Sequence, residues 1–235
     1  MRVAFLAPGS AAVFPDPRRG DAEGLVAVGG DLAPARLLAA YARGIFPMYG
    51  EDMPILWWSP DPRAILPAGS LHCSRSLRRS FRRAGFRLTW DAAFRDVMLG
   101  CDEDRSDGRW IWPEMVEAYG ALHRLGHAHS LEVWQGDALV GGIYGVQCGG
   151  LFAGESMFHR VTDASKVALV AAARTLFAAG IELFDVQYLT PHLASLGCVA
   201  VPREVYLRAL GAVRARSVDL RGLVPRFADE DVSSG

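Results

Sequence analysis

Lysine is nearly absent from this chain of 235 residues: Lys166 is the only one, so arginine carries almost all of the positive charge. Cysteine is also scarce, and the four cysteines show no CxxC spacing that would predict disulfide bonds or a structural zinc site. No apolar run approaches the roughly 18 residues needed to cross a bilayer, and residues 1–17 lack a basic segment followed by a long apolar one, so we do not expect secretion. We therefore expect a cytoplasmic protein without a membrane span.

The net charge of −1 conceals one strongly basic segment. Six arginines fall between Arg75 and Arg87, with no acidic residue among them. The spacing predicts an amphipathic helix over residues 74–84, with Leu77 and Phe81 on its apolar side. The alternative is a solvated helical face, but such a face usually mixes charges of both signs. We expect the following arginines to contact nucleic-acid phosphates: Arg75, Arg78, Arg79, Arg82 and Arg83.

The pattern of turns and apolar residues predicts an α+β protein without internal repeats. Proline and glycine cluster up to residue 67, which predicts a compact, turn-rich N-terminal α/β domain over residues 1–62. Residues 63–235 are expected to form a larger domain with a largely antiparallel sheet and flanking helices. Helices are expected over residues 34–43, 74–84, 113–125, 163–179, 191–196 and 203–216, the first capped by Asp31. Strands are expected over residues 129–134, 138–147, 151–158 and 181–187.

Polar side chains stand in apolar surroundings in two of these strands. Glu155 lies in the sequence GESMF, and Asp185 and Gln187 are two residues apart in FDVQ. Side chains alternate between the two faces of a strand, so Asp185 and Gln187 are expected on the same face. Buried polar groups are costly unless they are paired, and we interpret this pair as part of a site.

Other kinds of site are disfavoured. His123 and His127 are four residues apart, but Gly126 ends the helix between them, and with His129 they do not predict a metal site. Ser156 does not match the GxSxG pattern of hydrolases. Trp110 follows a charged run, where it could stack on a nucleobase at the mouth of a cavity.

Several long motifs in the same order resemble a known family. They are GLVAVGGDLAPARLLAAYARGIFP, ILWWSPDPRAIL, LHRLGHAHSLEVW, LVGGIYGV, GESMFHR, ASKVAL, FDVQ and HLASLG, between about Phe14 and Pro202. With these motifs the chain is similar to the bacterial leucyl/phenylalanyl-tRNA–protein transferases. The resemblance implies transfer of Leu or Phe, and less readily Met, from a charged tRNA to the N-terminal amine of proteins beginning with Arg or Lys. The product then carries a signal for N-degron proteolysis.

The resemblance also implies a GNAT-like second domain and particular site residues. Asp185 and Gln187 would be the catalytic pair, and Glu155 would contact polar groups of the bound aminoacyl-adenosine. The remaining substrate-binding residues would be Phe152 and Met157 in the Leu/Phe pocket, Tyr41, Trp110 and Tyr119 around the tRNA 3′ end, and Thr190. Two departures bear on binding: Met48 replaces a usual tryptophan, and the small residues Ala171–Ala173 would widen the apolar pocket.

The reaction implied is aminolysis of an already activated ester, so no cofactor and no ATP-binding loop are expected. We hypothesise that Asp185 orients Gln187 by accepting a hydrogen bond from its side-chain amide. The Gln187 carbonyl oxygen would then accept a hydrogen bond from the attacking amine. The expected partners are Leu-tRNA or Phe-tRNA and the acceptor protein, with the enzyme acting as a monomer.

Three alternatives remain at this point. A GNAT-like acyltransferase that uses acetyl-CoA would fit the order of strands and helices, but the turn at residues 159–163 has no glycine and contains an acidic residue where pyrophosphate would bind. A non-catalytic RNA-binding module would leave the Asp185/Gln187 pair without a purpose. A cell-wall peptide-bridge transferase would share the donor but act on a muramyl-peptide amine.

Overall fold

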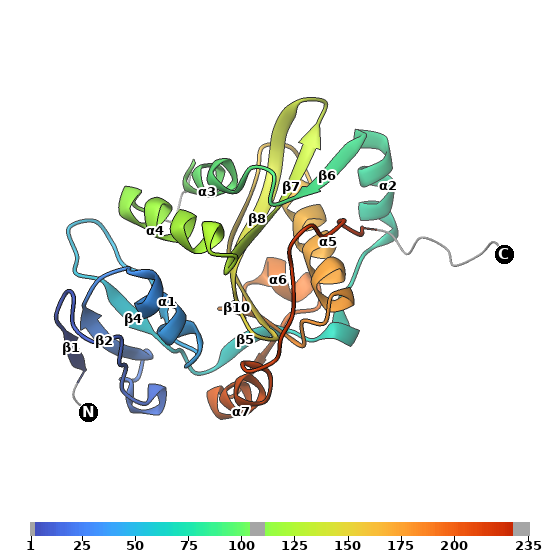
Figure 1. Ribbon diagram of the computed structural model, residues 1–235. Helices are drawn as coiled ribbons and strands as arrows, with labels where there is room; N and C mark the ends of the chain where they lie inside the picture. Colours follow the sequence, from blue (N-terminus) through green and yellow to red (C-terminus); the bar gives the residue numbers. More distant parts are fainter. Residues whose placement is uncertain (1–2, 104–110, 228–235) are drawn as a thin grey trace.

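Two β-sheets form the frame of the molecule, a computed structural model that describes residues 3–103 and 111–227 (Figure 1). The smaller sheet has the order β1-β2-β4-β3, in which β1 and β2 are parallel and the other pairs antiparallel. Its strands are β1 (Ala4–Leu6), β2 (Leu25–Gly29), β3 (Phe46–Pro47) and β4 (Leu56–Trp58). The helix α1 (Pro34–Tyr41) and a 3₁₀ turn (Pro17–Arg19) accompany this sheet.

The larger sheet has seven strands in the order β11-β5-β10-β9-β8-β7-β6. They are β5 (Arg63–Leu66), β6 (Phe86–Trp90), β7 (Ala128–Gln135), β8 (Ala138–Cys148), β9 (Leu151–His159), β10 (Leu183–Gln187) and β11 (Val199–Val201). Within the described residues, β9 and β10 are the one parallel pair of this sheet. The crossover between them is a helix, as a parallel connection requires.

Helices cover both faces of the larger sheet (Figure 1). They are α2 (Arg75–Ala84), α3 (Phe94–Asp102), α4 (Pro113–Arg124), α5 (Ala164–Ala178), α6 (Pro191–Ser195) and α7 (Arg203–Val213), with a further 3₁₀ turn at Ala68–Ser70. Ile143 packs in the core that contains α5, whereas its neighbour Tyr144 packs in the core that contains α1, α3 and α4. Successive side chains of β8 therefore pack into two separate hydrophobic cores. None of the described helices has the length and apolar character needed to cross a bilayer.

The predicted α+β class is confirmed, with a small N-terminal sheet and a larger sheet that is mostly antiparallel. The six predicted helices and four predicted strands are confirmed to within a few residues. The prediction that Asp31 caps the first helix is wrong, because Ala33 occupies the cap position. Asp31 instead accepts hydrogen bonds from the Arg36 guanidinium and from the backbone of Gly9 and Ala33.

The parallel pairing of β9 and β10 stops partway along the strands. The paired residues are Leu183 with Leu151, Phe184 with Phe152 and Asp185 with Ala153, and no pairing is recorded beyond them. The ladder between β9 and β8 then passes from Gly154 to Ser156, which leaves Glu155 as an extra residue. This bulge depends on Gly145, because a Cβ atom there would lie 2.3 Å from the carbonyl oxygen of Ala153.

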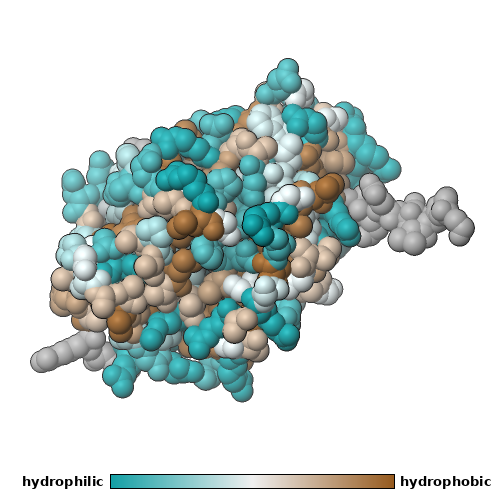
Figure 2. Space-filling model, viewed as in Figure 1, coloured by the Kyte–Doolittle hydropathy of each residue, from teal (hydrophilic) through white to brown (hydrophobic). Residues whose placement is uncertain are grey.

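A second irregularity falls at the end of β10. Its pairing with β5 passes from Asp185 to Gln187 and skips Val186, and Gln187 has a φ of 55°. A positive φ is uncommon for a residue other than glycine, and such residues gather at functional sites. The two neighbouring strands thus separate and distort at the same level of the sheet. Figure 2 shows the surface of the molecule from the same side as Figure 1. Apolar residues gather across the middle of this surface, and its upper and lower margins are mostly polar.

Candidate active site

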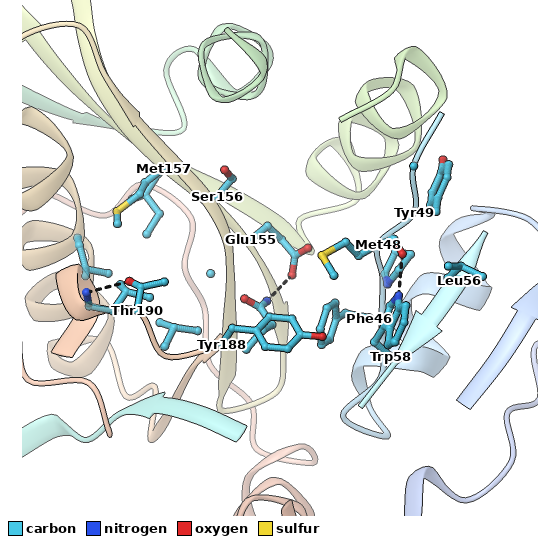
Figure 3. Close-up of a pocket in the computed structure, with 18 residues that line it drawn as sticks. Phe46, Met48, Tyr49, Leu56, Trp58, Glu155, Ser156, Met157, Tyr188 and Thr190 are labelled. Carbon is cyan, nitrogen blue, oxygen red and sulfur yellow. Dashed lines mark hydrogen bonds between the residues drawn. The ribbon is translucent and has the colours of Figure 1, made fainter. Parts of the chain in front are cut away.

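A cavity that contains Glu155 and Gln187 lies where β9 and β10 separate, facing β3 and β4 (Figure 3). Its volume is about 620 Å³, within the range of about 300–1,000 Å³ that holds small ligands. The smaller sheet contributes one wall, and the larger sheet with α5 and α6 contributes the other. Neither part of the chain forms this cavity alone.

The two ends of the cavity differ in their chemistry. The end formed by the larger sheet and its helices is mostly aliphatic, with the side chains of Ile143, Met157, Leu169, Val186 and Leu193, and Figure 3 shows Thr190 on the same side. The opposite end is rich in rings and is formed by Phe46, Met48, Tyr49, Leu56, Trp58 and Tyr188. Figure 3 shows Met157 and Tyr49 on opposite sides of Glu155. The cavity can therefore hold an apolar side chain at one end and a planar ring at the other.

The polar centre of the cavity consists of Glu155 and Gln187. The side-chain amide of Gln187 donates a hydrogen bond of 3.0 Å to Oε1 of Glu155, drawn as a dashed line in Figure 3. This bond orients the carboxamide, and its carbonyl oxygen is the atom that can accept a hydrogen bond from a ligand.

Two buried tyrosines lie behind Glu155. The Tyr119 hydroxyl donates to Oε2 of Glu155 at 3.4 Å, and the hydroxyl oxygens of Tyr119 and Tyr41 are 2.6 Å apart. Burial, opposed by hydrogen bonds from these tyrosines, raises the pKa of Glu155 to about 8. Burial, followed by the nearby Glu155 charge, raises the pKa of both tyrosines well above the usual value, so they remain neutral donors.

Asp185 lies outside the cavity in a buried ion pair. Arg63 donates to its two carboxylate oxygens at 2.8 and 2.6 Å, and the Tyr206 hydroxyl donates at 2.9 Å. The remaining contact of the carboxylate comes from the backbone N–H of Gln187 at 3.0 Å. The Arg63 guanidinium is stacked between the rings of Phe46 and Tyr206, 4.8 and 4.6 Å from their centroids.

The hypothesis that Asp185 accepts from the side-chain amide of Gln187 is wrong, because that amide donates to Glu155. The expectation that Asp185 and Gln187 share one face assumed regular alternation along the strand. The bulge at Val186 and the positive φ of Gln187 remove that regularity. Asp185 instead holds the backbone of Gln187 in its unusual conformation through the hydrogen bond to the N–H group.

Comparison with known proteins identifies the family. A model of the leucyl/phenylalanyl-tRNA protein transferase family matches residues 65–211, and a model of the N-terminal domain of these transferases matches residues 30–61. The chain belongs to this family.

Individual transferases of the family are similar over most of their length. The leucyl/phenylalanyl-tRNA–protein transferase of Citrobacter koseri is 52% identical over 215 residues, which cover 91% of this chain and 92% of that relative. The transferase of Anaeromyxobacter sp. is 54% identical over 212 residues, covering 89% and 90% of the two chains. Among solved structures, L-PGS from Bacillus licheniformis aligns with a TM-score of 0.40 and 11% identity, over 56% of this chain and 47% of that one.

The structure brings together only part of the site that the transferase resemblance implied. Glu155, Met157, Gln187 and Thr190 all line the cavity. Tyr41 and Tyr119 are almost completely buried and contact Glu155 from behind, so they support the site without forming its surface. Trp110 lies outside the described residues.

The expectation that Phe152 lines the apolar pocket is wrong. Phe152 is buried in the core, edge-to-face with Phe184 at 5.3 Å between ring centroids, and does not border the cavity. Ala171–Ala173 are also buried in α5, whose Leu169 reaches the cavity instead. Met48 does line the cavity, and its carbonyl oxygen accepts a hydrogen bond of 2.7 Å from the Trp58 indole.

Several residues of the site escaped the sequence analysis. Trp58 and Tyr188 line the cavity, and Arg63 and Tyr206 bind Asp185. The motif ILWWSPDPRAIL contains both Trp58 and Arg63, and an arginine between apolar residues was a signal that a buried carboxylate partner exists. Tyr188 directly follows the FDVQ motif, so its closeness to the predicted site residues was also a signal in the sequence.

The basic helix is formed as predicted. The Ser74 hydroxyl caps α2 by accepting from the backbone N–H of Leu77 at 3.1 Å, and Gly85 ends it in the left-handed conformation. The side chains of Arg75, Arg79, Arg82 and Arg83 are exposed and that of Arg78 is partly buried. In Figure 1, α2 lies beside β6 at the edge of the larger sheet that is remote from the N-terminal sheet.

Two of the three histidines have structural partners. Nδ1 of His129 lies 2.7 Å from Asp91, and Nδ1 of His123 lies 2.8 Å from the carbonyl oxygen of Ala128. No group of three or more His, Cys, Asp or Glu side chains suited to a metal ion occurs within residues 3–103 and 111–227.

The buried ion pair makes a testable difference to stability. The substitution Asp185→Asn removes the charge that balances Arg63, and we expect it to lower the free energy of unfolding by about 3–5 kcal/mol. The control is Asp219→Asn, because Asp219 pairs with Arg221 at the surface, where solvent screens the two charges and the pair adds little to stability. Urea denaturation at pH 7 measures both values. Equal stability of the two variants would contradict the role assigned to Asp185.

Proposed function

We propose that this transferase moves Leu or Phe, and less readily Met, from aminoacyl-tRNA to the α-amine of proteins that begin with Arg or Lys. The product would be marked for N-degron proteolysis, and the donors Leu-tRNA and Phe-tRNA imply a cytoplasmic enzyme. The observation that carries this proposal is the cavity with an aliphatic end, a ring-lined end and the pair Glu155–Gln187 between them. An aminoacyl-adenosine has the same three parts in the same order: an apolar side chain, a reactive ester and an adenine ring.

We also infer a division of labour between two domains, residues 1–62 and residues 63–235. The first would supply the ring-lined wall through β3 and β4, and the second would supply the aliphatic wall and the polar centre. Closure of the cavity would then require both domains to be folded and in contact.

The chemistry needs no further activation of the donor, because the ester bond to the tRNA is already reactive. The nucleophile is an α-amine with a reference pKa of about 7.7–8.0, so roughly a tenth of it is neutral at pH 7. A lysine side-chain amine, with a pKa of about 10.4, would be neutral less than about one time in a thousand. Holding the amine and the ester together in one cavity therefore accounts for much of the expected acceleration.

Selection of the amino acid follows from the aliphatic end. Met157, Leu169 and Leu193 make this end mostly apolar, so it favours Leu, Phe and Met over polar side chains. Each methylene group that fails to fill such a pocket costs about 1–3 kcal/mol, which disfavours smaller side chains.

Gln187 is assigned the role of holding the amine. Its carbonyl oxygen accepts one N–H of the attacking amine and stabilises the positive charge that develops on the nitrogen. Asp185 acts on the reaction only through Gln187, as a positioning residue, because its carboxylate is buried and does not border the cavity.

The central test of the function uses radiolabelled Leu-tRNA and three peptides that differ only in their first residue: Arg, Lys or Ala. We expect label to enter the Arg and Lys peptides and not the Ala peptide. Scintillation counting of the separated peptides measures the transfer. Equal labelling of all three, or none with an active tRNA preparation, would contradict the proposal.

The substitution Gln187→Met keeps the length of the side chain but removes its carbonyl oxygen. We expect kcat to fall by about 10²–10³-fold, the usual cost of losing one hydrogen bond to a developing charge. Binding of an unreactive amide analogue of phenylalanyl-adenosine should change much less, and calorimetry measures it. Gln135→Met, at an exposed position at the end of β7, is the control and should retain normal turnover. Equal losses in turnover and in binding would refute this role.

The exposed arginines of α2 are expected to bind tRNA phosphates without reading the sequence. The double substitution Arg79→Glu with Arg82→Glu should weaken binding of Phe-tRNA and reduce the slope of log Kd against log salt by about one to two. Filter binding at several salt concentrations measures both quantities. Arg208→Glu, at an exposed position on α7, is the matched control. A slope that is unchanged in the α2 variant would exclude these contacts.

A further inference from the structure

We propose, on the basis of the proposed transfer reaction, that Glu155 is the general base and general acid of that reaction. Its carboxylate accepts a proton from the attacking α-amine and then donates this proton to the 3′-oxygen of the departing tRNA. Glu155 is thereby a catalytic residue and more than a contact for the aminoacyl-adenosine. The inference rests on the position of its carboxylate and on the contacts that occupy the other polar groups nearby.

Neither residue of the predicted catalytic pair can move this proton. A carboxamide such as that of Gln187 is neither a base nor an acid near neutral pH. Asp185 is fully buried, and its two oxygens accept four hydrogen bonds from Arg63, Tyr206 and the backbone of Gln187. The reaction nevertheless requires that the nitrogen lose one proton and the 3′-oxygen gain one.

Glu155 has the required location. Among the described residues it is the one carboxylate that lines the cavity, and the bulge in β9 sets it apart from the regular ladder. Its Oε1 lies 3.0 Å from the amide nitrogen of Gln187. An amine that donates to the carbonyl oxygen of the same carboxamide therefore lies close to Glu155, as proton transfer requires.

The protonation chemistry is matched to the substrate. The raised pKa of Glu155, about 8, is close to the reference pKa of an α-amine, so a proton can pass between the two at little cost in free energy. The groups that face Glu155 are Tyr41 from α1, Tyr119 from α4, Asp185 from β10 and Arg63 from β5. The tyrosines are neutral donors, and the charges of Asp185 and Arg63 act in opposite directions on Glu155.

The proposed step is balanced. The neutral amine attacks the ester carbon, and a carbon–nitrogen bond forms while ionised Glu155 removes one proton from the nitrogen. The tetrahedral intermediate then collapses, the bond between the carbonyl carbon and the 3′-oxygen breaks, and protonated Glu155 returns the proton to that oxygen. The products are the extended peptide, a free tRNA 3′-hydroxyl and Glu155 in its original ionised form.

The first test compares two donors in the full-length enzyme: the phenylalanyl ester of adenosine and the p-nitrophenyl ester of phenylalanine, with an acceptor peptide that begins with Arg. The nitrophenolate leaves without a proton and departs from the tetrahedral intermediate before the nitrogen has to lose one, so this donor needs neither of the two proton transfers assigned to Glu155. We expect Glu155→Gln to lower kcat by at least 100-fold with the adenosine ester and by less than tenfold with the nitrophenyl ester. Equal losses with the two donors would overturn the proposal, because a residue that only positions Gln187 affects both alike.

The second test is the pH dependence of kcat/KM for the adenosine ester below pH 7. Wild type must lose one proton from the amine and one from Glu155, so log kcat/KM should rise with a slope of about two. Glu155→Gln should rise with a slope of about one, and Glu155→Asp, which keeps the carboxylate, should retain a slope of about two. A slope of one in wild type would overturn the proposal.

Controls separate this proposal from folding and from the function itself. Glu23→Gln, an exposed position in the N-terminal region, should match wild type with both donors. Binding of the unreactive phenylalanyl-adenosine amide should change less than threefold in Glu155→Gln, which establishes an intact cavity. Absence of transfer by the wild-type enzyme from Phe-tRNA to the Arg peptide would instead refute the proposed function.

Discussion

The buried pair of Arg63 and Asp185 is the interaction on which the site depends. Arg63 begins β5, Asp185 lies in β10, and their contact is fully enclosed. The guanidinium also donates to the carbonyl oxygen of Gly44 at 3.0 Å and stacks on Phe46, so it ties the small sheet to the large one. An ion pair without solvent is stable only when its remaining hydrogen-bonding groups are satisfied, and here Gly44 and Tyr206 meet that need.

This pair also determines where the polar atoms of the cavity point. The carboxylate of Asp185 fixes the backbone of Gln187 in a conformation with positive φ. The side chain of Gln187 then reaches across the gap between β9 and β10 to Glu155, which stands on the opposite bulge. Two local distortions of a regular sheet are therefore joined by one hydrogen bond, and the separation of the strands leaves the space for a ligand between them.

The parts of the fold that follow from local sequence could be predicted. The helix over Arg75–Ala84 is one example, because Ser74 and Gly85 mark its two ends directly. The Ala-rich helix between β9 and β10 is another, since it is apolar on nearly all sides and most of its residues are buried. The helix α3 was not predicted, although the spacing of Phe94, Val97 and Cys101 is a helical signal of the same kind.

The contacts within the site could not be predicted from local patterns. Arg63 and Asp185 are 122 residues apart in the sequence, and no periodicity links them. Alternation along a strand placed Asp185 and Gln187 on one face, and a bulge that depends on β5 overrides it. Tyr41 and Tyr119 were associated with the site only through the family resemblance. That they support Glu155 from within the core depends on the packing of α1 against α4.

The use of two sheets for the two ends of the cavity has a consequence for how such enzymes diversify. The residues that would face the nucleobase include Trp58 in β4 and Met48, which directly follows β3, so they belong to the small sheet, whereas Met157 and Leu169 belong to the large sheet and its helix. Substitution of a residue at the ring-lined end of the cavity therefore leaves the aliphatic end unchanged. Under the proposed function, recognition of the RNA terminus and choice of the transferred amino acid would thus change independently in evolution, provided that the central carboxamide and carboxylate stay in place.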